Sequence, residues 1–179
     1  MEVKLSNILT PVLPYGVVRD QWETLRIGES KSRIDHRSIV AIYFLPLVFG
    51  VCAGIWGTAL VDNAPALLVT VAVYTGAFFS LLLGVFDKSL LIRSAPFQEG
   101  DEATLDLADQ LFTNICYTVV VGLITAAVLA CVLAFSDPAS AAWVSRITAG
   151  VVAGLLAHIF AMSGMIMKRF RSLREALKP

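Results

Sequence analysis

Four long apolar stretches constrain this chain more than any other feature. The first three, 39–61, 65–86 and 111–135, contain no Asp, Glu, Lys or Arg, and the fourth, 143–167, contains only Arg146 near its start. Each stretch exceeds the roughly 20 apolar residues needed to cross a hydrocarbon core. The sequence therefore predicts an all-α integral membrane protein built as a four-transmembrane-helix bundle.

The composition argues against a soluble bundle. Hydrophobic residues make up 57% of the 179 residues, and charged residues make up only 16%. Helices of a soluble bundle need a polar face at every turn, and these four stretches have none. No cleavable signal is visible ahead of the first stretch, so its helix is expected to act as the insertion signal.

The distribution of Lys and Arg predicts the orientation of the bundle. Thirteen of the fourteen basic residues fall in the N-terminal segment 1–38, the middle loop 87–110 or the C-terminal segment 168–179. Both termini and this loop are therefore expected in the cytoplasm, with a bacterial inner membrane as the expected location. Trp56 and Trp143 are expected at the outer interface, where Arg146 can extend its guanidinium to the headgroups.

The segment before the first apolar stretch carries the signal of an N-terminal amphipathic helix. Val18, Trp22 and Leu25 recur at helical spacing. Gly28 follows at a position suited to ending the helix. Two interpretations are open: an interfacial helix on the inner leaflet, which we favour, and a contact for a partner or a neighbouring subunit. Further on, "SRID" resembles a capping box, which predicts that the first membrane helix begins near Ser32.

Two helical extensions of opposite charge are expected at the cytoplasmic face. Asp101 is a candidate N-cap, so the third helix is expected to start there and to project below the membrane. Apolar residues at helical spacing after Ile166 predict that the fourth helix continues to about residue 177. The expected contacts for a cytosolic protein partner, or for each other, are Trp22, the acids Glu99, Asp101, Glu102, Asp106 and Asp109, and the bases Lys168, Arg169, Arg171 and Arg174. Two alternatives are open: the charges are only solvated, or the basic segment binds anionic lipid headgroups.

Small residues four positions apart recur in each apolar stretch, a pattern that lets membrane helices approach closely. The packing residues predicted on this basis are Gly50, Gly54, Gly76, Ser80, Gly84, Gly122, Ala126, Gly150, Gly154 and Ala161. Because small residues occur on more than one side of a helix, a homo-oligomer is expected, either a dimer or a tetramer. Pro46 is expected to kink the first helix.

His158 is a titratable residue within the fourth apolar stretch, and Gly154 and Ala161 share its helix face. It is therefore expected to face a close helix contact, roughly 13 Å from the inner boundary. Polar side chains at similar depth complete a candidate intramembrane site: Tyr74, Thr75, Tyr117 and Thr118. A hydrogen-bonded structural imidazole is favoured over a proton relay or a pore-lining switch, because no carboxylate or Lys lies at that depth.

No catalytic or metal-binding pattern accompanies this histidine. Ser163 lies about 140° around the helix from His158, so the two cannot form a dyad within one chain. The sequence has no HExxH motif, no pair of intramembrane aspartates, no phosphate-binding glycine loop and no calcium-ligand spacing. Its three cysteines have neither disulfide nor metal-ligand spacing. The chain is therefore expected not to be an enzyme, to hold no metal or cofactor, and to bind no nucleic acid.

The functional hypothesis follows from this architecture. The chain is expected to be a non-catalytic, self-assembling membrane subunit that acts as an anchor, scaffold or sensor for a cytosolic partner. The alternative is an oligomeric channel or membrane-permeabilising effector that a partner gates. No motif identifies a family. In topology alone, the chain resembles many unrelated small membrane proteins, including membrane effectors and sensors of bacterial antiphage systems, so phage defence is one setting considered.

Overall fold

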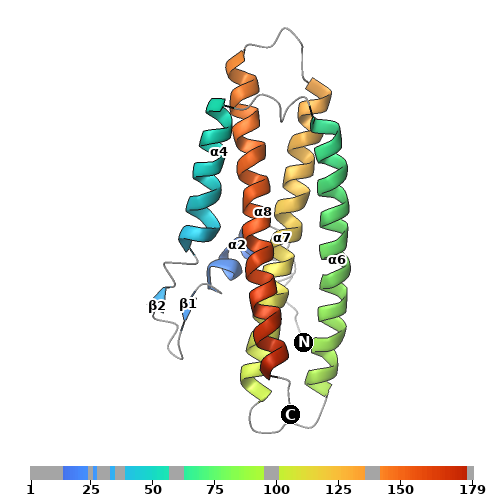
Figure 1. Cartoon of the computed structure of the whole chain (residues 1–179). Coiled ribbons are helices and arrows are strands. Elements are labelled where there is room, and N and C mark those ends of the chain that lie inside the picture. Colours follow the sequence, from blue (N-terminus) through green and yellow to red (C-terminus); the bar gives the residue numbers. More distant parts are fainter. Residues whose placement is uncertain are drawn as a thin grey trace, which may run out of the picture.

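The computed structural model describes residues 14–23, 26–27, 33–34, 39–56, 63–94, 101–135 and 142–176. Nearly all of these residues are helical (Figure 1). The elements in chain order are α2 (Pro14–Glu23), β1 (Arg26–Ile27), β2 (Arg33–Ile34), the π-helix η2 (Val40–Phe44), α4 (Leu45–Trp56), α6 (Ala64–Ser94), α7 (Asp101–Phe135) and α8 (Ala142–Ala176). Helices α4, α6, α7 and α8 run alternately up and down.

Three of these helices are long and apolar enough to cross a membrane, which confirms an all-α membrane protein. The candidate spans are Ala64–Leu90, Leu105–Ala134 and Trp143–Glu175. Helices α7 and α8 each have 35 residues, so each is roughly 52 Å long and exceeds a hydrocarbon core of about 30 Å. The apolar helix Val40–Trp56 is shorter and falls below this length criterion. Residues 57–61, which complete the first predicted span, lie outside the described residues.

The middle loop is shorter than the predicted range 87–110. Helix α6 continues past Asp87 to Ser94, and α7 begins at Asp101, the residue at which the sequence predicts its start. Charged residues do not end α6, because helical hydrogen bonding continues once the chain leaves the apolar layer. Helix α8 ends at Ala176, one residue before its predicted end.

The N-terminal part differs from two expectations. A membrane helix beginning near Ser32 is wrong, because Arg33 and Ile34 form a strand that pairs antiparallel with Ile27 and Arg26. This pairing uses an extended backbone that a helix start cannot adopt. Helix α2 ends at Glu23, ahead of the predicted stop at Gly28, which lies outside the described residues.

The packing follows a simple order. Helix α4 packs against α8, α8 against α7, and α7 against α6, while α2 packs against α7. Figure 1 shows α4 beside the upper half of α8, with α2 at a lower level. Helix α7 has the most buried described residues, including Leu111, Ile115 and Leu129. It is therefore the centre of the bundle.

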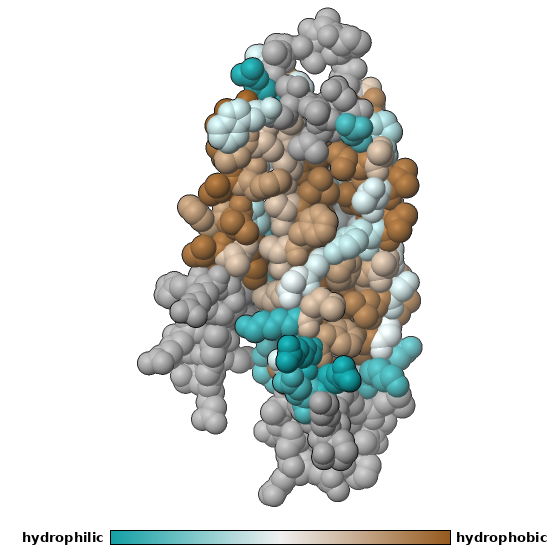
Figure 2. Space-filling view, viewed as in Figure 1, coloured by the Kyte–Doolittle hydropathy of each residue, from teal (hydrophilic) through white to brown (hydrophobic). Residues whose placement is uncertain are grey.

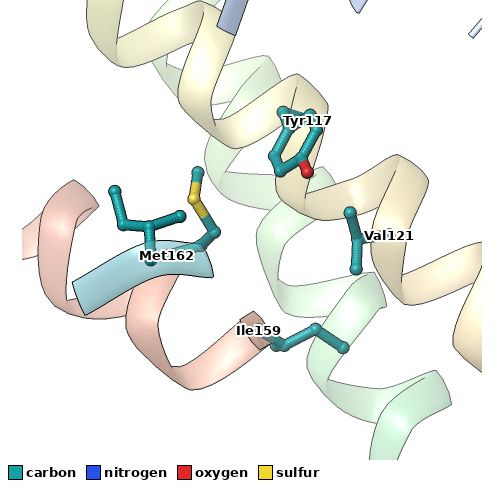
Figure 3. Close-up of a cluster of buried hydrophobic side chains, with 5 residues drawn as sticks. Tyr117, Val121, Ile159 and Met162 are labelled. Atoms are coloured by element: carbon teal, nitrogen blue, oxygen red, sulfur yellow. The ribbon is translucent and has the colours of Figure 1, made fainter. Parts of the chain in front are cut away.

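Apolar clusters fill the bundle along its length. One cluster gathers around Val71 and Leu129, a second around Tyr117 and Met162, and a third around Leu111. Figure 3 shows part of the second cluster, in which side chains of α7 face those of α8. On the face shown in Figure 2, hydrophobic side chains cover most of the described height, and hydrophilic side chains gather towards its lower end, with a few at the upper end. Such a surface suits lipid and would be unfavourable in water.

Candidate functional site around His158

The candidate site begins with a proline. Pro46 has no backbone N–H, so the carbonyl four residues earlier, that of Ile42, loses its helical donor. The backbone around this carbonyl is a π-helix, in which the Leu45 N–H bonds the Val40 oxygen five residues back. The Nδ1 atom of His158 lies 2.7 Å from the Ile42 oxygen. His158 therefore supplies from α8 the donor that Pro46 removes.

The second ring nitrogen of His158 is also bonded. Its Nε2 atom lies 3.0 Å from the Tyr117 hydroxyl oxygen on α7. A carbonyl oxygen can only accept, so Nδ1 carries the proton of a neutral ring and Nε2 accepts from Tyr117. The two hydrogen bonds together fix one tautomer and one ring orientation.

Aromatic rings surround the imidazole. The ring centroid of Tyr43 in η2 lies 5.5 Å from that of His158, and that of Tyr117 lies 5.6 Å away, edge-on. The Trp22 ring of α2 is 5.9 Å from Tyr43. The site thus joins α2, η2, α7 and α8.

A second contact ties α2 to the same place. The Gln21 side chain is fully buried, and its Nε2 atom lies 3.7 Å from the Met162 sulfur. Figure 3 shows Met162 and Ile159 on α8 opposite Tyr117 and Val121 on α7. The face of α2 that packs inward carries Val17 and Gln21, whereas Val18 and Trp22 keep 46% and 43% of their surface exposed. Leu25, the third residue of the predicted apolar face, lies outside the described residues.

The other predicted polar residues do not gather around His158. The Tyr74 hydroxyl lies 2.6 Å from the Ser163 hydroxyl, which also donates to the Ile159 carbonyl. Thr118 donates to the Asn114 carbonyl of its own helix. Thr75 is buried against Gly122 at the contact of α6 and α7. Of the candidate set, Tyr117 is thus the residue that bonds His158.

The predicted packing residues fall into two groups. Gly50 and Gly54 of α4 lie directly against Gly150 and Gly154 of α8, because a Cβ on Gly50 would stand 2.7 Å from the Gly150 oxygen. Gly122 is likewise close to Thr75, Ala126 packs at the edge of an apolar cluster, and Ala161 is half-buried. In contrast, Gly76 and Gly84 have nothing within 4 Å of a Cβ position, and Ser80 between them is exposed.

The charged ends of α7 and α8 meet through an amide. Arg169 donates from Nη1 to Gln110 Oε1 at 2.9 Å, and Gln110 donates from Nε2 to Asp106 at 2.6 Å. Arg171 pairs with Glu175 of its own helix at 3.1 Å. The exposed members of the predicted set are Trp22, Asp106, Asp109, Lys168, Arg171 and Arg174. The side chains of Asp101 and Glu102 are not described, and Glu99 lies outside the described residues.

Sequence reasoning placed His158 in a helix contact but missed two of its partners. Tyr43 and the Ile42 carbonyl come from the first apolar helix, and neither was among the candidates. The signal that points to them is Pro46, because a proline deprives the carbonyl four residues earlier of its helical donor.

The chemistry available at this site is limited. Among the residues that the structure describes, no group of three or more His, Cys, Asp or Glu side chains is placed to hold a metal ion. Cys52, Cys116 and Cys131 are free thiols. The arrangement around His158 offers hydrogen bonds from the ring to the Tyr117 hydroxyl and to the Ile42 carbonyl. Comparisons with family models, curated proteins and solved structures found no match.

Proposed function

We propose that the chain is a non-catalytic, self-assembling inner-membrane subunit that anchors, scaffolds or senses for a cytosolic protein partner. The observation that carries the proposal is the paired, oppositely charged end of α7 and α8. This charged end would bind a charged surface of a cytosolic protein.

This charged end is a fixed surface. Helix α8 continues without a break beyond Met167, the last residue of its apolar stretch, to Ala176. The Arg169–Gln110–Asp106 chain of hydrogen bonds links it to α7. Lys168, Arg171 and Arg174 remain exposed at three-residue spacing along α8. A preorganised row of cations loses little entropy when it binds a complementary partner, which favours docking.

The packed interior favours a scaffold over a pore within one chain. In the described part of the bundle, three apolar clusters follow one another along the axis. Both nitrogens of His158 are bonded to protein groups. An aqueous path needs side chains that face water, so this interior supports a structural role for the histidine.

The membrane arrangement belongs to the same proposal. Helix Val40–Trp56 has 17 residues, near the lower limit of about 17 for a spanning helix. We take it as the first of four spans, with both termini and the 95–100 connection in the cytoplasm. Helix α2 then lies at the inner interface, with Val18 and Trp22 directed towards lipid.

Self-assembly is proposed through α6. Ala72, Gly76, Ser80 and Gly84 form an exposed row of small residues on this helix. The glycines of α4 and α8 already pack against each other within the chain, so the α6 row is the better surface for a second copy, in a dimer or a tetramer.

In-cell photo-crosslinking tests the docking surface. A photoreactive residue in place of the exposed Ser172 should give a protein adduct, and the same residue in place of the exposed Phe160 of the apolar layer should not. The double change Lys168→Glu and Arg174→Glu should abolish the Ser172 adduct. Lys88→Glu, which reverses an exposed base on α6, serves as the matched charge control. Adducts with lipid alone, or an adduct that survives the double reversal, would contradict a protein partner.

A further inference from the structure

A groove runs along the outside of the bundle between α4 and α8. Its volume is about 540 Å³, within the range of roughly 300–1,000 Å³ that is typical of small-molecule sites. The groove exists because the glycine contact brings the two helices so close that larger side chains stand on either side of it.

The floor and walls of the groove have different origins. Gly50, Gly54, Gly150 and Gly154 supply a floor of backbone. The walls are apolar side chains that project on both sides: Leu47 and Val51 from α4, and Ile147 and Val151 from α8. The groove is therefore a trough lined almost entirely by apolar atoms and open to the surrounding lipid.

One end of the trough is charged. Among the residues that line it, Arg146 is the single charged one. Trp143, which is one turn away on α8, and Trp56 at the end of α4 are both largely exposed. Exposed tryptophans gather at the level of lipid headgroups. Arg146, which is itself exposed, therefore lies at headgroup depth, and the apolar trough leads from it towards the bilayer centre.

We propose that this groove is a binding site for one anionic phospholipid of the leaflet at that end. The headgroup phosphate binds the Arg146 guanidinium, whose planar fork matches a phosphate with two hydrogen bonds. One acyl chain lies in the trough from Arg146 to Leu155, a length of roughly 13 Å along α8.

The charge favours an anionic lipid over a second copy's apolar helix. The groove carries a positive charge at one end, and no acid is among its lining residues. The site is independent of the cytosolic partner proposed above.

Native mass spectrometry of the full chain in detergent tests the site. Phosphatidylglycerol and phosphatidylcholine with the same acyl chains are titrated separately. A one-to-one adduct with phosphatidylglycerol should form and should survive greater collisional activation than the phosphatidylcholine adduct. Arg146→Gln should weaken the phosphatidylglycerol adduct roughly tenfold, because it removes a charge-assisted hydrogen bond. Arg174→Gln at the opposite end should leave it unchanged.

Filling the trough gives a second, steric test. Val151→Phe places a ring over the trough and should displace the lipid, whereas Val73→Phe on the exposed face of α6 should not. Equal adducts in wild type, Arg146→Gln and Val151→Phe would overturn the proposal. Loss of a dimer mass in Val151→Phe, with lipid retention unchanged, would also overturn it and assign the groove to a second copy.

Discussion

At the scale of single residues, His158 and Pro46 act as a complementary pair. His158→Leu leaves the Ile42 carbonyl without the donor that Pro46 already removed from the helix. We expect a loss of about 1 kcal/mol in bundle stability, the scale of hydrogen bonds between membrane helices. His158→Asn retains a donor near the Nδ1 position and His158→Gln retains an acceptor near Nε2, so each should cost less. Thermal unfolding in one detergent measures the order.

A double-mutant cycle separates this pairing from simple packing. Pro46→Ala returns a helical N–H to the Ile42 carbonyl, so His158→Leu should cost less in that background. Tyr117→Phe removes the other bond of the imidazole, and Pro46→Ala should not offset its cost. If His158→Leu lowers the bundle stability equally in the wild-type and Pro46→Ala backgrounds, the hydrogen bond to the Ile42 carbonyl is not the source of the stabilisation by His158.

At the scale of elements, the contact of α4 with α8 depends on glycines, whose lack of a side chain lets the two backbones touch. Gly50→Ala would bring a methyl group to 2.7 Å from the Gly150 oxygen, so the helices must separate, at a cost of about 1–3 kcal/mol. Gly164→Ala on α8 is the matched control, because nothing lies within 4 Å of its Cβ position and it lies outside the α6 row. It should be neutral or stabilising by up to about 1 kcal/mol. Equal destabilisation of the two variants in a thermal unfolding series would refute the glycine contact.

The elements also show what the sequence can predict. The apolar stretches locate α6, α7 and α8. The thickness of the bilayer requires a long run of consecutive apolar residues, and such a run can be recognised directly in the sequence. The start near Ser32 fails, because a four-residue capping pattern is weaker evidence than the strand pairing of Arg33 and Ile34 with Ile27 and Arg26. The partners of His158 are separated from it by 41 and 116 positions. Contacts between residues so far apart in the sequence cannot be predicted from a local sequence pattern.

At the scale of the whole molecule, the orientation sets which end meets the cytosol. In a variant without Cys52, Cys116 and Cys131, a single cysteine at position 98 should be protected from a membrane-impermeant maleimide in intact cells and modified after lysis. A cysteine at position 139, in the opposite connection, should be modified in intact cells and is the matched control. Labelling at 98 from outside would invert the positive-inside assignment.

Assembly and conduction then decide between a scaffold and a channel. The packed interior predicts that proteoliposomes of the purified chain pass no ions, whatever its oligomeric state. Native mass spectrometry should show a dimer or tetramer, and Gly76→Leu on the exposed face of α6 should shift it towards monomer, whereas the matched change Gly164→Leu at an exposed position of α8 should not. A channel built between copies would instead show flux that depends on assembly and is lost with Gly76→Leu. It would also change between about pH 5 and 8 if His158 lines the path. Flux that His158→Gln leaves intact but Gly76→Leu abolishes would place a conducting path between subunits, away from the imidazole, and would reject the scaffold.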